Sequence, residues 1–255
     1  MSPMNYAERL SFFESIHQGI EDGRLDHYAR AMSHPSGVGR LSHITDDVLS
    51  TLLDGIPIRP GMKVLDLGCG RGFLGRWLEW RGLQVHYVGI DFSPSAVESA
   101  RRNVPRGQVV LGDFQTALEL GSFDAVFAIE TSGEGMVDAD LARAMLGPLA
   151  DGGVAIATLV SAGRSFQQAS EASIEAINAL RGEAFVRDFT EAVVPSVRAF
   201  YEMVRNDSSM PEAIQESFRS ESDLMLRLIH DRSYGYGALI ATRAKGELGT
   251  SPGSF

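Results

Sequence analysis

Acidic residues beside a glycine-rich turn are the part of this sequence with the most evident chemistry. Asp66 lies two residues before Gly68 in the stretch Lys63-Val-Leu-Asp-Leu-Gly-Cys-Gly-Arg-Gly-Phe73, where glycines recur at positions 68, 70 and 72. Glycines expose backbone N–H groups and let a ligand approach where side chains would block it. A carboxylate at such a turn repels a pyrophosphate but attracts a cation. The stretch therefore predicts a site for a nucleotide-type ligand that carries positive charge.

The elements around this turn predict an open α/β sheet. Residues 64–67 have the composition of a buried strand, and a helical pattern follows the glycines. Further strands are predicted over residues 85–90, 109–114, 123–129, 154–159 and 238–242. Asp91 comes 19 residues after Gly72, at the end of the second strand, where a carboxylate can accept hydrogen bonds from both ribose hydroxyls. The alternative is that Asp91 is only a turn residue.

The run Val64-Leu-Asp-Leu-Gly-Cys-Gly-Arg-Gly72 resembles the first motif of the class I S-adenosylmethionine (SAM) methyltransferases. SAM carries a sulfonium, an ammonium and no phosphate, which suits an acidic pocket. The resemblance implies that Asp91 binds the ribose, that Asp113 reads the adenine amino group, and that Phe114 stacks on the adenine or packs in the core. The cofactor-binding residues that it implies are Asp66, Gly68, Cys69, Gly70, Asp91, Phe92, Asp113, Phe114 and Glu130.

The same resemblance implies a seven-stranded Rossmann-like α/β sandwich. Its parts are an N-terminal helical segment (1–55), a SAM-binding core (56–160), a helical cap over the acceptor (161–232), a closing strand (233–245) and a disordered tail (246–255). The cap is predicted because about 70 residues of mostly helical pattern follow the fifth strand. A bare fold would need one helix there, so the extra residues are expected to exclude water from the acceptor site.

The fourth predicted strand runs into Glu130-Thr-Ser-Gly-Glu-Gly-Met136. This turn resembles one found in tocopherol-type and prenyl-diphosphate C-methyltransferases. The resemblance implies that Glu130 stabilises or deprotonates a carbocation, whereas a Glu facing a sulfonium can also serve in cofactor binding alone. The sequence departs from the related pattern at Gly135, where that pattern has histidine. Proton abstraction by a histidine of this turn is therefore not expected.

The loop from His34 to His43 precedes the first strand. In methyltransferases that this chain resembles, such a segment folds over the cofactor, so both histidines are candidates for contact with SAM or the acceptor. His43 is a candidate base, and Tyr28 and Arg40 are candidates for acceptor binding. The alternative is a solvated connection between helices.

The predicted cap contributes its own acceptor candidates. Arg198 and Arg205 could bind an anionic group, because a guanidinium binds phosphate or carboxylate through two hydrogen bonds. Tyr201 could line an apolar pocket. The alternative is that these residues belong to the ordinary core and the solvated surface.

The composition of the chain limits the kinds of partner and location that we expect. The formal net charge is −10, with no run of lysine and arginine, which disfavours a nucleic-acid partner. No apolar stretch reaches the roughly 18 residues that cross a membrane. The single cysteine, Cys69, excludes an intramolecular disulfide and fits a cytoplasmic location. We expect a monomer or a homodimer that acts on a small molecule.

These observations predict transfer of the SAM methyl group to a small, partly apolar metabolite. One form is C-methylation of a prenyl diphosphate, with Glu130 handling the carbocation and Mg²⁺ accompanying the diphosphate. The other is O- or N-methylation of an aromatic compound or an amine, in which His34, His43 or Glu130 takes the proton or no base is needed. A third, of another class, is a SAM-binding cyclase or regulatory protein that does not methylate. Methyl transfer from a sulfonium requires no metal, and the sequence has no H-E-x-x-H motif or cysteine cluster.

Overall fold

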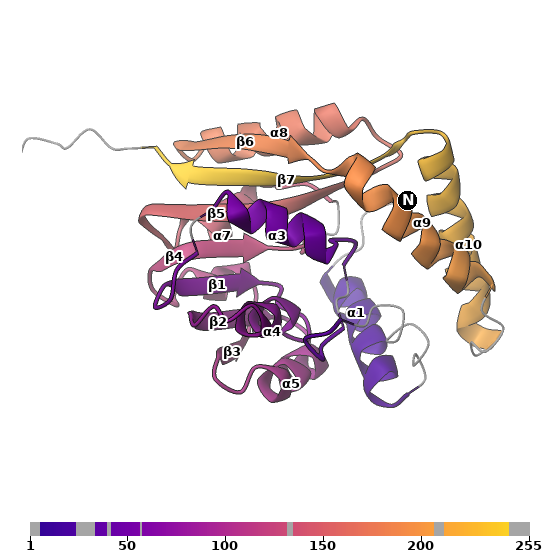
Figure 1. Ribbon diagram of the computed structural model, residues 1–255, viewed down its shortest axis with the longest axis horizontal. Helices are drawn as coiled ribbons and strands as arrows, with labels where there is room; N and C mark the ends of the chain where they lie inside the picture. Colours follow the sequence, from indigo (N-terminus) through magenta and orange to yellow (C-terminus); the bar gives the residue numbers. More distant parts are fainter. Residues whose placement is uncertain are drawn as a thin grey trace, which may run out of the picture.

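A seven-stranded sheet with the order β3-β2-β1-β4-β5-β7-β6 runs through the molecule (Figure 1). The computed structural model describes residues 6–23, 34–39, 42–56, 58–131, 135–206 and 212–244. The strands are β1 (Lys63–Leu67), β2 (His86–Asp91), β3 (Gln108–Leu111), β4 (Phe123–Ala128), β5 (Leu149–Ala162), β6 (Gly182–Asp188) and β7 (Tyr234–Arg243). Strands β1 to β5 pair in parallel, and β7 runs antiparallel to β5 and β6. The predicted Rossmann-like sheet is confirmed.

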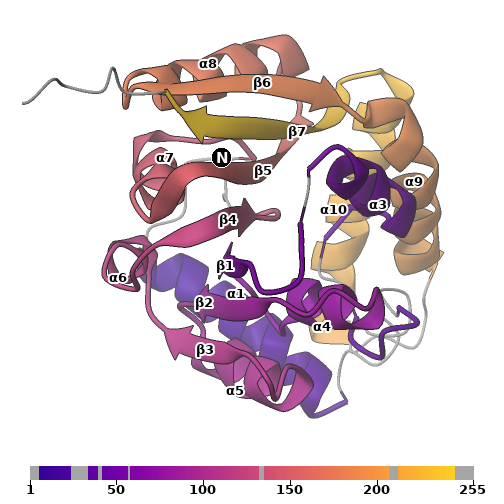
Figure 2. The ribbon, with the colours of Figure 1, turned by 60° about the vertical axis from the view of Figure 1, so that its left-hand side comes forward.

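Helices cover both faces of the sheet (Figure 2). Buried side chains of α3 (Asp46–Asp54), α4 (Phe73–Trp80), α9 (Thr190–Asn206) and α10 (Glu212–His230) form one core cluster with β1, β4, β5 and β7. Those of α6 (Phe114–Ala117), α7 (Ala139–Leu146) and α8 (Phe166–Asn178) form a second cluster. Helix α5 (Pro94–Asn103) packs on β2 and β3. Of the described helices, none is long and apolar enough to cross a membrane.

Two helix starts follow directly from the sequence. Thr45 caps α3 by accepting a hydrogen bond from the backbone N–H of Val48 (3.2 Å). Ser93 caps α5 in the same way, with Pro94 as the first helical residue. Serine and threonine satisfy the free N–H groups of a first turn, and proline costs nothing there because its missing N–H would have no partner. Because α5 begins directly after Asp91, its cap holds the end of β2 in place.

The segment predicted to be a helical cap contains part of the core instead. Helix α8 and strand β6 both lie between residues 161 and 232, and only α9 and α10 are added to the basic fold, between β6 and β7. Strand β6 is at the sheet edge and carries exposed residues such as Phe185, which is 56% exposed. A half-solvated edge strand lacks the apolar run that identifies an interior strand. The predicted tail, residues 246–255, lies outside the described residues.

Helices α9 and α10 stand beyond the carboxyl ends of the parallel strands (Figures 1 and 2). They are packed onto the core by buried side chains that include Val193, Val197, Met225 and Ile229. Helix α1 (Tyr6–Glu21) lies at the same end of the sheet, alongside α5 (Figure 2). In an open α/β sheet ligands bind at this edge, so all three helices are placed to shape a binding site.

Candidate functional site

A cavity of about 300 Å³ lies at the carboxyl ends of β1, β2 and β4. Its floor is the glycine turn, in which Gly68, Gly70 and Gly72 all have φ between 51° and 82°, in the left-handed region. A Cβ atom at Gly68 would lie 2.6 Å from Cγ2 of Thr131. The turn therefore needs glycine both for its backbone conformation and for the space beside β4.

Seven of the residues predicted to bind the cofactor line this one cavity. They are Gly68, Gly70, Asp91, Phe92, Asp113, Phe114 and Glu130. They come from four separate segments of the chain, and the sheet topology brings the ends of those segments together. Their role in binding remains a prediction.

Asp91 ends β2 and is 6% exposed. Its Oδ2 accepts a hydrogen bond from the backbone N–H of Gly70 (2.8 Å), and its Oδ1 accepts one from the N–H of Ser93 (2.9 Å). Burial raises the pKa of the Asp91 carboxyl, and these backbone donors act in the opposite direction. The two bonds fix the carboxylate between the glycine turn and the start of α5, in the wall of the cavity.

Asp66 and Cys69 are not in the described cavity wall, contrary to the prediction. Asp66 is 3% exposed, and its Oδ2 accepts a hydrogen bond from the hydroxyl of Tyr87 (2.7 Å). The register pairs Asp66 with Gly89, whose missing side chain makes room for that hydroxyl. Burial, reinforced by the charge of Asp91, raises the pKa of Asp66 to about 7. Cys69 packs in the core cluster that also holds Tyr87.

Asp113 lies in the cavity wall but not at a strand end. Strand β3 stops at Leu111, and Asp113 is the N-cap of the short helix α6. Its Oδ1 accepts hydrogen bonds from the backbone N–H groups of Gln115 (3.0 Å) and Thr116 (3.1 Å). An aspartate that caps its own helix is fixed in direction, and Phe114 beside it also faces the cavity.

Glu130 follows β4 and has φ of 51°, a conformation that is costly for a residue with a side chain. Its backbone N–H donates to Oγ1 of Thr158 (2.6 Å). Its Oε1 accepts hydrogen bonds from the hydroxyl of Tyr236 (2.9 Å) and from the backbone N–H of His43. These bonds hold one carboxylate oxygen while the residue lines the cavity.

His43 links Glu130 to the helices beyond the sheet edge. Its Nδ1 lies 3.1 Å from the hydroxyl of Tyr234 and 4.0 Å from Oε2 of Glu130. Its Nε2 lies 3.3 Å from the hydroxyl of Tyr201, which in turn donates to Oε1 of Glu221 (3.3 Å). Burial raises the pKa of the Glu221 carboxyl. We call these five residues, together with Tyr236, the Glu130 cluster.

Three members of the Glu130 cluster were missed from the sequence: Glu221, Tyr234 and Tyr236. The pair Tyr234-Gly-Tyr236 stands at the start of β7, next to β5 in the sheet. Side chains two residues apart in a strand share a face, so the pair was a usable signal. Glu221 gave none, because a single glutamate in an amphipathic helix is usually a solvated residue.

Helix α1 covers the cavity, a contact that was not predicted from the sequence. Phe13 and His17 line the cavity wall. Glu14 accepts a hydrogen bond from Oγ of Ser93 (2.6 Å), which ties the helix to the start of α5. His17 is 4% exposed, and its Nδ1 is buried with no hydrogen-bond partner within the described residues. Burial lowers the pKa of His17 to about 4, so the imidazole is neutral at pH 7.

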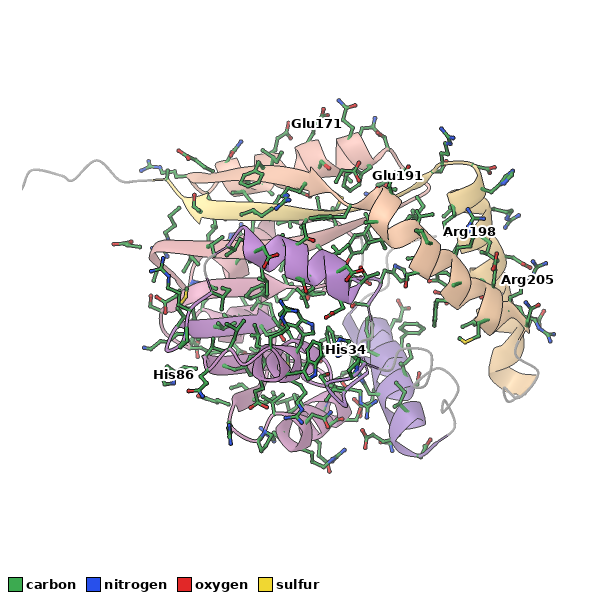
Figure 3. The ribbon with its side chains drawn as sticks, viewed as in Figure 1. His34, His86, Glu171, Glu191, Arg198 and Arg205 are labelled. Carbon is green, nitrogen blue, oxygen red and sulfur yellow. The ribbon has the colours of Figure 1, made fainter. Side chains whose placement is uncertain are left out.

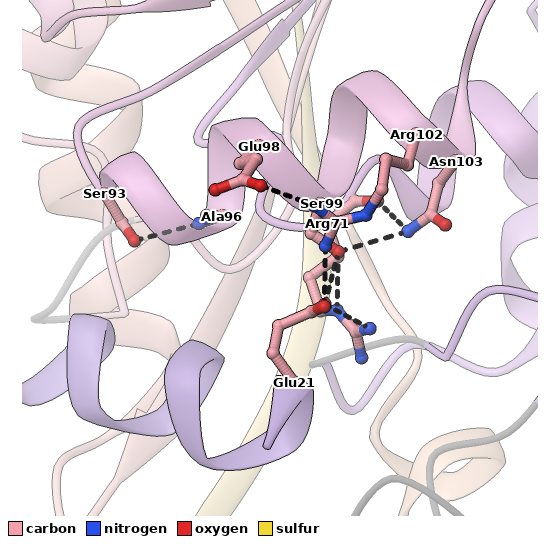
Figure 4. Close-up of polar contacts among 8 residues, drawn as sticks. All are labelled: Glu21, Arg71, Ser93, Ala96, Glu98, Ser99, Arg102 and Asn103. Carbon is pink, nitrogen blue, oxygen red and sulfur yellow. Dashed lines mark hydrogen bonds and ion pairs between the residues drawn. The ribbon is translucent and has the colours of Figure 1, made fainter. Parts of the chain in front are cut away.

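Glu21 fastens the end of α1 (Figure 4). It forms ion pairs with Arg71 of the glycine turn (2.9 Å) and Arg102 of α5 (2.6 Å), and it accepts a hydrogen bond from Ser99 (2.9 Å). Burial acts to raise the pKa of Glu21, but the Ser99 bond and the two arginine charges outweigh it and hold the pKa below its usual value.

The predicted anion-binding arginines are not at the site. Arg198 and Arg205 lie on the outer side of α9 and point away from the sheet (Figure 3). Both are exposed, and Nε of Arg205 is 2.9 Å from Oδ1 of Asp223 on α10. The positions of these arginines in the helical pattern did not show that their side chains face outward. Tyr28 and Arg40 lie outside the described residues.

His34 is not in the cavity wall either. Its Nε2 lies 3.2 Å from Oδ1 of Asp46, and its ring packs edge-on against Phe73 and Trp80. Of the two histidines in the loop, the structure brings only His43 to Glu130. Within the described part of the chain, no group of three or more histidine, cysteine or acidic residues is placed to hold a metal ion.

Comparison with known proteins agrees with this geometry. Residues 64–153 match the family model described as "Methyltransferase domain". The match spans β1 to the middle of β5 and includes the glycine turn, Asp91, Asp113 and Glu130. The predicted resemblance to class I SAM-dependent methyltransferases is confirmed over this segment.

Relatives in sequence match only part of this chain. The ribosomal RNA small subunit methyltransferase C of Chromohalobacter salexigens is 36% identical over 104 residues, which are 37% of this chain and 29% of that protein. The chain thus spans under a third of the length of the first curated relatives that it matches.

Solved structures extend the likeness to the whole fold. Phosphoethanolamine N-methyltransferase 2 of Haemonchus contortus aligns with a TM-score of 0.70 at 17% identity, over 95% of this chain and 61% of that chain. The [4+2]-cyclase SpnF aligns with a TM-score of 0.65 at 20% identity, over 92% and 97% of the two chains. At these identities the likeness concerns the fold alone.

Proposed function

We propose that this protein is a SAM-dependent methyltransferase of a small molecule. The observation that carries the proposal is the single cavity that joins the glycine turn, Asp91 and Asp113 to Glu130. The methyltransferase domain supports it, and so do solved relatives of the same fold that hold SAM or S-adenosylhomocysteine.

The residues of the cavity fit SAM. Four carboxylates line the described wall, those of Asp91, Asp113, Glu130 and Asp140, and no lysine or arginine does. Such a wall attracts the sulfonium and ammonium of SAM and would repel a phosphate. We assign Asp91 to the ribose hydroxyls and Asp113 to the adenine amino group. SAM, when bound, supplies a methyl group attached to a cationic sulfur. When the methyl group is transferred, the sulfur keeps the electron pair of the broken bond.

We assign Glu130 the role of base or acceptor anchor. Its Oε1 is held by Tyr236 and by the backbone of His43, whereas within the described residues no hydrogen bond engages Oε2. The free oxygen can take a proton from an acceptor heteroatom or orient an ammonium, and His43 lies 4.0 Å away. Holding one oxygen fixed keeps the other aligned, which is a large part of what an enzyme contributes to methyl transfer.

Between the two acceptor classes, the structure favours an amine or a phenol over a prenyl diphosphate. The arginines that would bind a diphosphate, Arg198 and Arg205, face outward. The Glu130 cluster instead offers two carboxylates, an imidazole and three tyrosine hydroxyls. These groups suit an acceptor that loses a proton when it is methylated. Mg²⁺ has no part in this proposal, because a diphosphate acceptor was the reason to include it.

A small acceptor is also favoured over RNA. The likeness to the ribosomal RNA small subunit methyltransferase C covers 37% of this chain and 29% of that protein. The net charge of −10 opposes contact with a phosphate backbone. The single cysteine, buried in the core, supports a cytoplasmic location as part of the proposal.

A second candidate is a SAM-binding protein that promotes cyclisation without methyl transfer. The observation in its favour is the alignment with the [4+2]-cyclase SpnF over nearly the full length of both chains. The two candidates share the cofactor cavity and differ in whether the methyl group moves.

The test is methyl transfer from SAM labelled in its methyl group, read by mass spectrometry across phenols, amines, keto acids, short prenyl diphosphates and total RNA. We expect label in a phenol or an amine and its loss in Glu130→Gln. Arg198→Ala is the matched control, because it removes a charge far from the cavity. Label in a prenyl diphosphate or in RNA would refute the acceptor class. Turnover without any label would favour the cyclase.

A further inference from the structure

We propose that His17 of α1 is a cofactor-binding residue that recognises the carboxylate of the amino-acid end of SAM. This inference rests on the proposed identity of the cofactor, but not on the proposed acceptor. None of the sequence motifs includes His17, because it lies on a helix more than 40 residues before the glycine turn.

The position of His17 is the first argument. The residue lines the cavity, and a Cβ atom built on Gly70 would be 3.8 Å from Cε1 of its ring. The imidazole therefore lies over the glycine turn. Nδ1 of the ring is fully buried, and within the described residues it has no hydrogen-bond partner. Buried polar groups in native proteins nearly always have a partner, so a ligand in the cavity would complete the site.

The chemistry of the wall is the second argument. The amino-acid end of SAM carries a carboxylate as well as an ammonium, and the wall already holds four carboxylates. The cofactor carboxylate therefore needs a donor. The hydroxyl of Thr131 donates to the carbonyl of Leu67 (2.6 Å), and Gln115 lies on α6 beside Asp113, at the end assigned to adenine. Among the described side chains of the cavity wall near the glycine turn, His17 therefore remains as the one with an N–H to donate.

The neutral state of the imidazole suits this task. A neutral histidine always carries one N–H, and it offers a hydrogen bond without bringing a charge into a buried site. Glu14 and Glu21, one turn before and one turn after His17, fasten α1 to α5 and to the glycine turn. The helix thus holds His17 in register with Gly70.

The experiment compares two ligands that differ only in the amino-acid end. S-adenosylhomocysteine has this end, whereas 5′-methylthioadenosine keeps the nucleoside and the sulfur and lacks it. Both affinities are measured by calorimetry on the full chain. We expect His17→Phe, which keeps a flat ring but has no N–H, to weaken S-adenosylhomocysteine on the order of tenfold. Its effect on 5′-methylthioadenosine should be under about twofold.

Two more variants distinguish the loss of the N–H donor from a general disturbance of the cavity wall. His17→Gln retains an N–H donor and should restore a large part of the preference for S-adenosylhomocysteine. Phe13→Leu is the matched control, because Phe13 lines the same wall from the same helix without a donor, and it should affect both ligands alike. Equal losses for both ligands in His17→Phe, or no loss at all, would overturn the inference. Failure of the wild type to bind S-adenosylhomocysteine would instead refute the proposed function.

Discussion

The folded protein is expected to lose stability as the pH rises towards 7, and replacing Asp66 with Asn should remove most of this loss. Asp66 is buried beneath the glycine turn with the Tyr87 hydroxyl as its hydrogen-bond donor, and burial raises its pKa from 3.8 to about 7. The folded state therefore holds a proton on Asp66 at pH values where the unfolded chain has lost it. The resulting stability is fully present below pH 3.8 and is lost as the pH rises to about 7.

The magnitude follows from the size of this shift. About three pKa units at roughly 1.36 kcal/mol per unit give on the order of 4 kcal/mol in total. Between pH 5 and pH 8, the unfolding free energy decreases by about 2–3 kcal/mol through Asp66, because part of the total decrease already occurs below pH 5. Asn accepts the Tyr87 hydrogen bond, but its NH2 group must also be accommodated, which changes the stability at every pH. The pH dependence of the stability is therefore a better test than the stability at one pH.

The assay is urea denaturation at pH 5 and at pH 8. The wild type should lose about 2–3 kcal/mol more of its unfolding free energy over this interval than Asp66→Asn. Other titrating groups are common to both proteins and cancel. Asp54→Asn, which removes an exposed carboxylate, controls for net charge. Parallel pH dependence in wild type and Asp66→Asn would refute the reasoning. A large loss of S-adenosylhomocysteine binding would restore Asp66 to the cofactor site.

Three other predictions concern the site directly. Asp91→Ala should weaken S-adenosylhomocysteine by about 1.5–3 kcal/mol in calorimetry, from loss of charge-assisted hydrogen bonds; unchanged affinity would disprove the ribose assignment. Tyr236→Phe frees one lone pair on Oε1 of Glu130 and should lower kcat on the order of tenfold with little change in cofactor affinity; equal losses in both would make Glu130 a cofactor ligand. The double variant Arg198→Ala/Arg205→Ala should keep wild-type turnover in the labelled-methyl assay, and a raised KM would return these arginines to the acceptor site.

The segments that meet at the cavity could be predicted because the backbone conformation of the glycine turn depends on residue type. The glycines at 68, 70 and 72 adopt left-handed conformations that few other residues tolerate, so their spacing identifies the turn. Asp91 was found because it ends a strand next to that turn. The prediction for Asp66 was wrong about direction, since the sequence does not show that the Tyr87 hydroxyl meets its side chain across Gly89.

The residues that were missed come from segments without a local signal. His17 lies on a helix that no sequence motif marks. The hydrogen bond from Ser93 to Glu14 and the ion pairs of Glu21 with Arg71 and Arg102 place that helix over the cavity. These pairs join residues that are 50 or more positions apart in the chain. Strand β6 was hidden for a different reason, because an edge strand is half solvated. Tertiary packing decides such features, and no window of sequence contains it.

The residues of the proposed chemistry fall partly inside and partly outside the match to the family model. The matched residues, 64–153, include the glycine turn, Asp91 and Glu130. The residues that surround Glu130 lie outside this range: His43 precedes it, and Tyr201, Glu221, Tyr234 and Tyr236 follow it.

Glu130 therefore connects the residues that match the family model with residues outside that match. Its φ of 51° stores a strain that the hydrogen bond to Thr158 and the contacts of its carboxylate maintain. If acceptor choice depends on the surrounding segments, changes at Tyr201 or Glu221 should alter which acceptor is methylated while cofactor affinity stays the same.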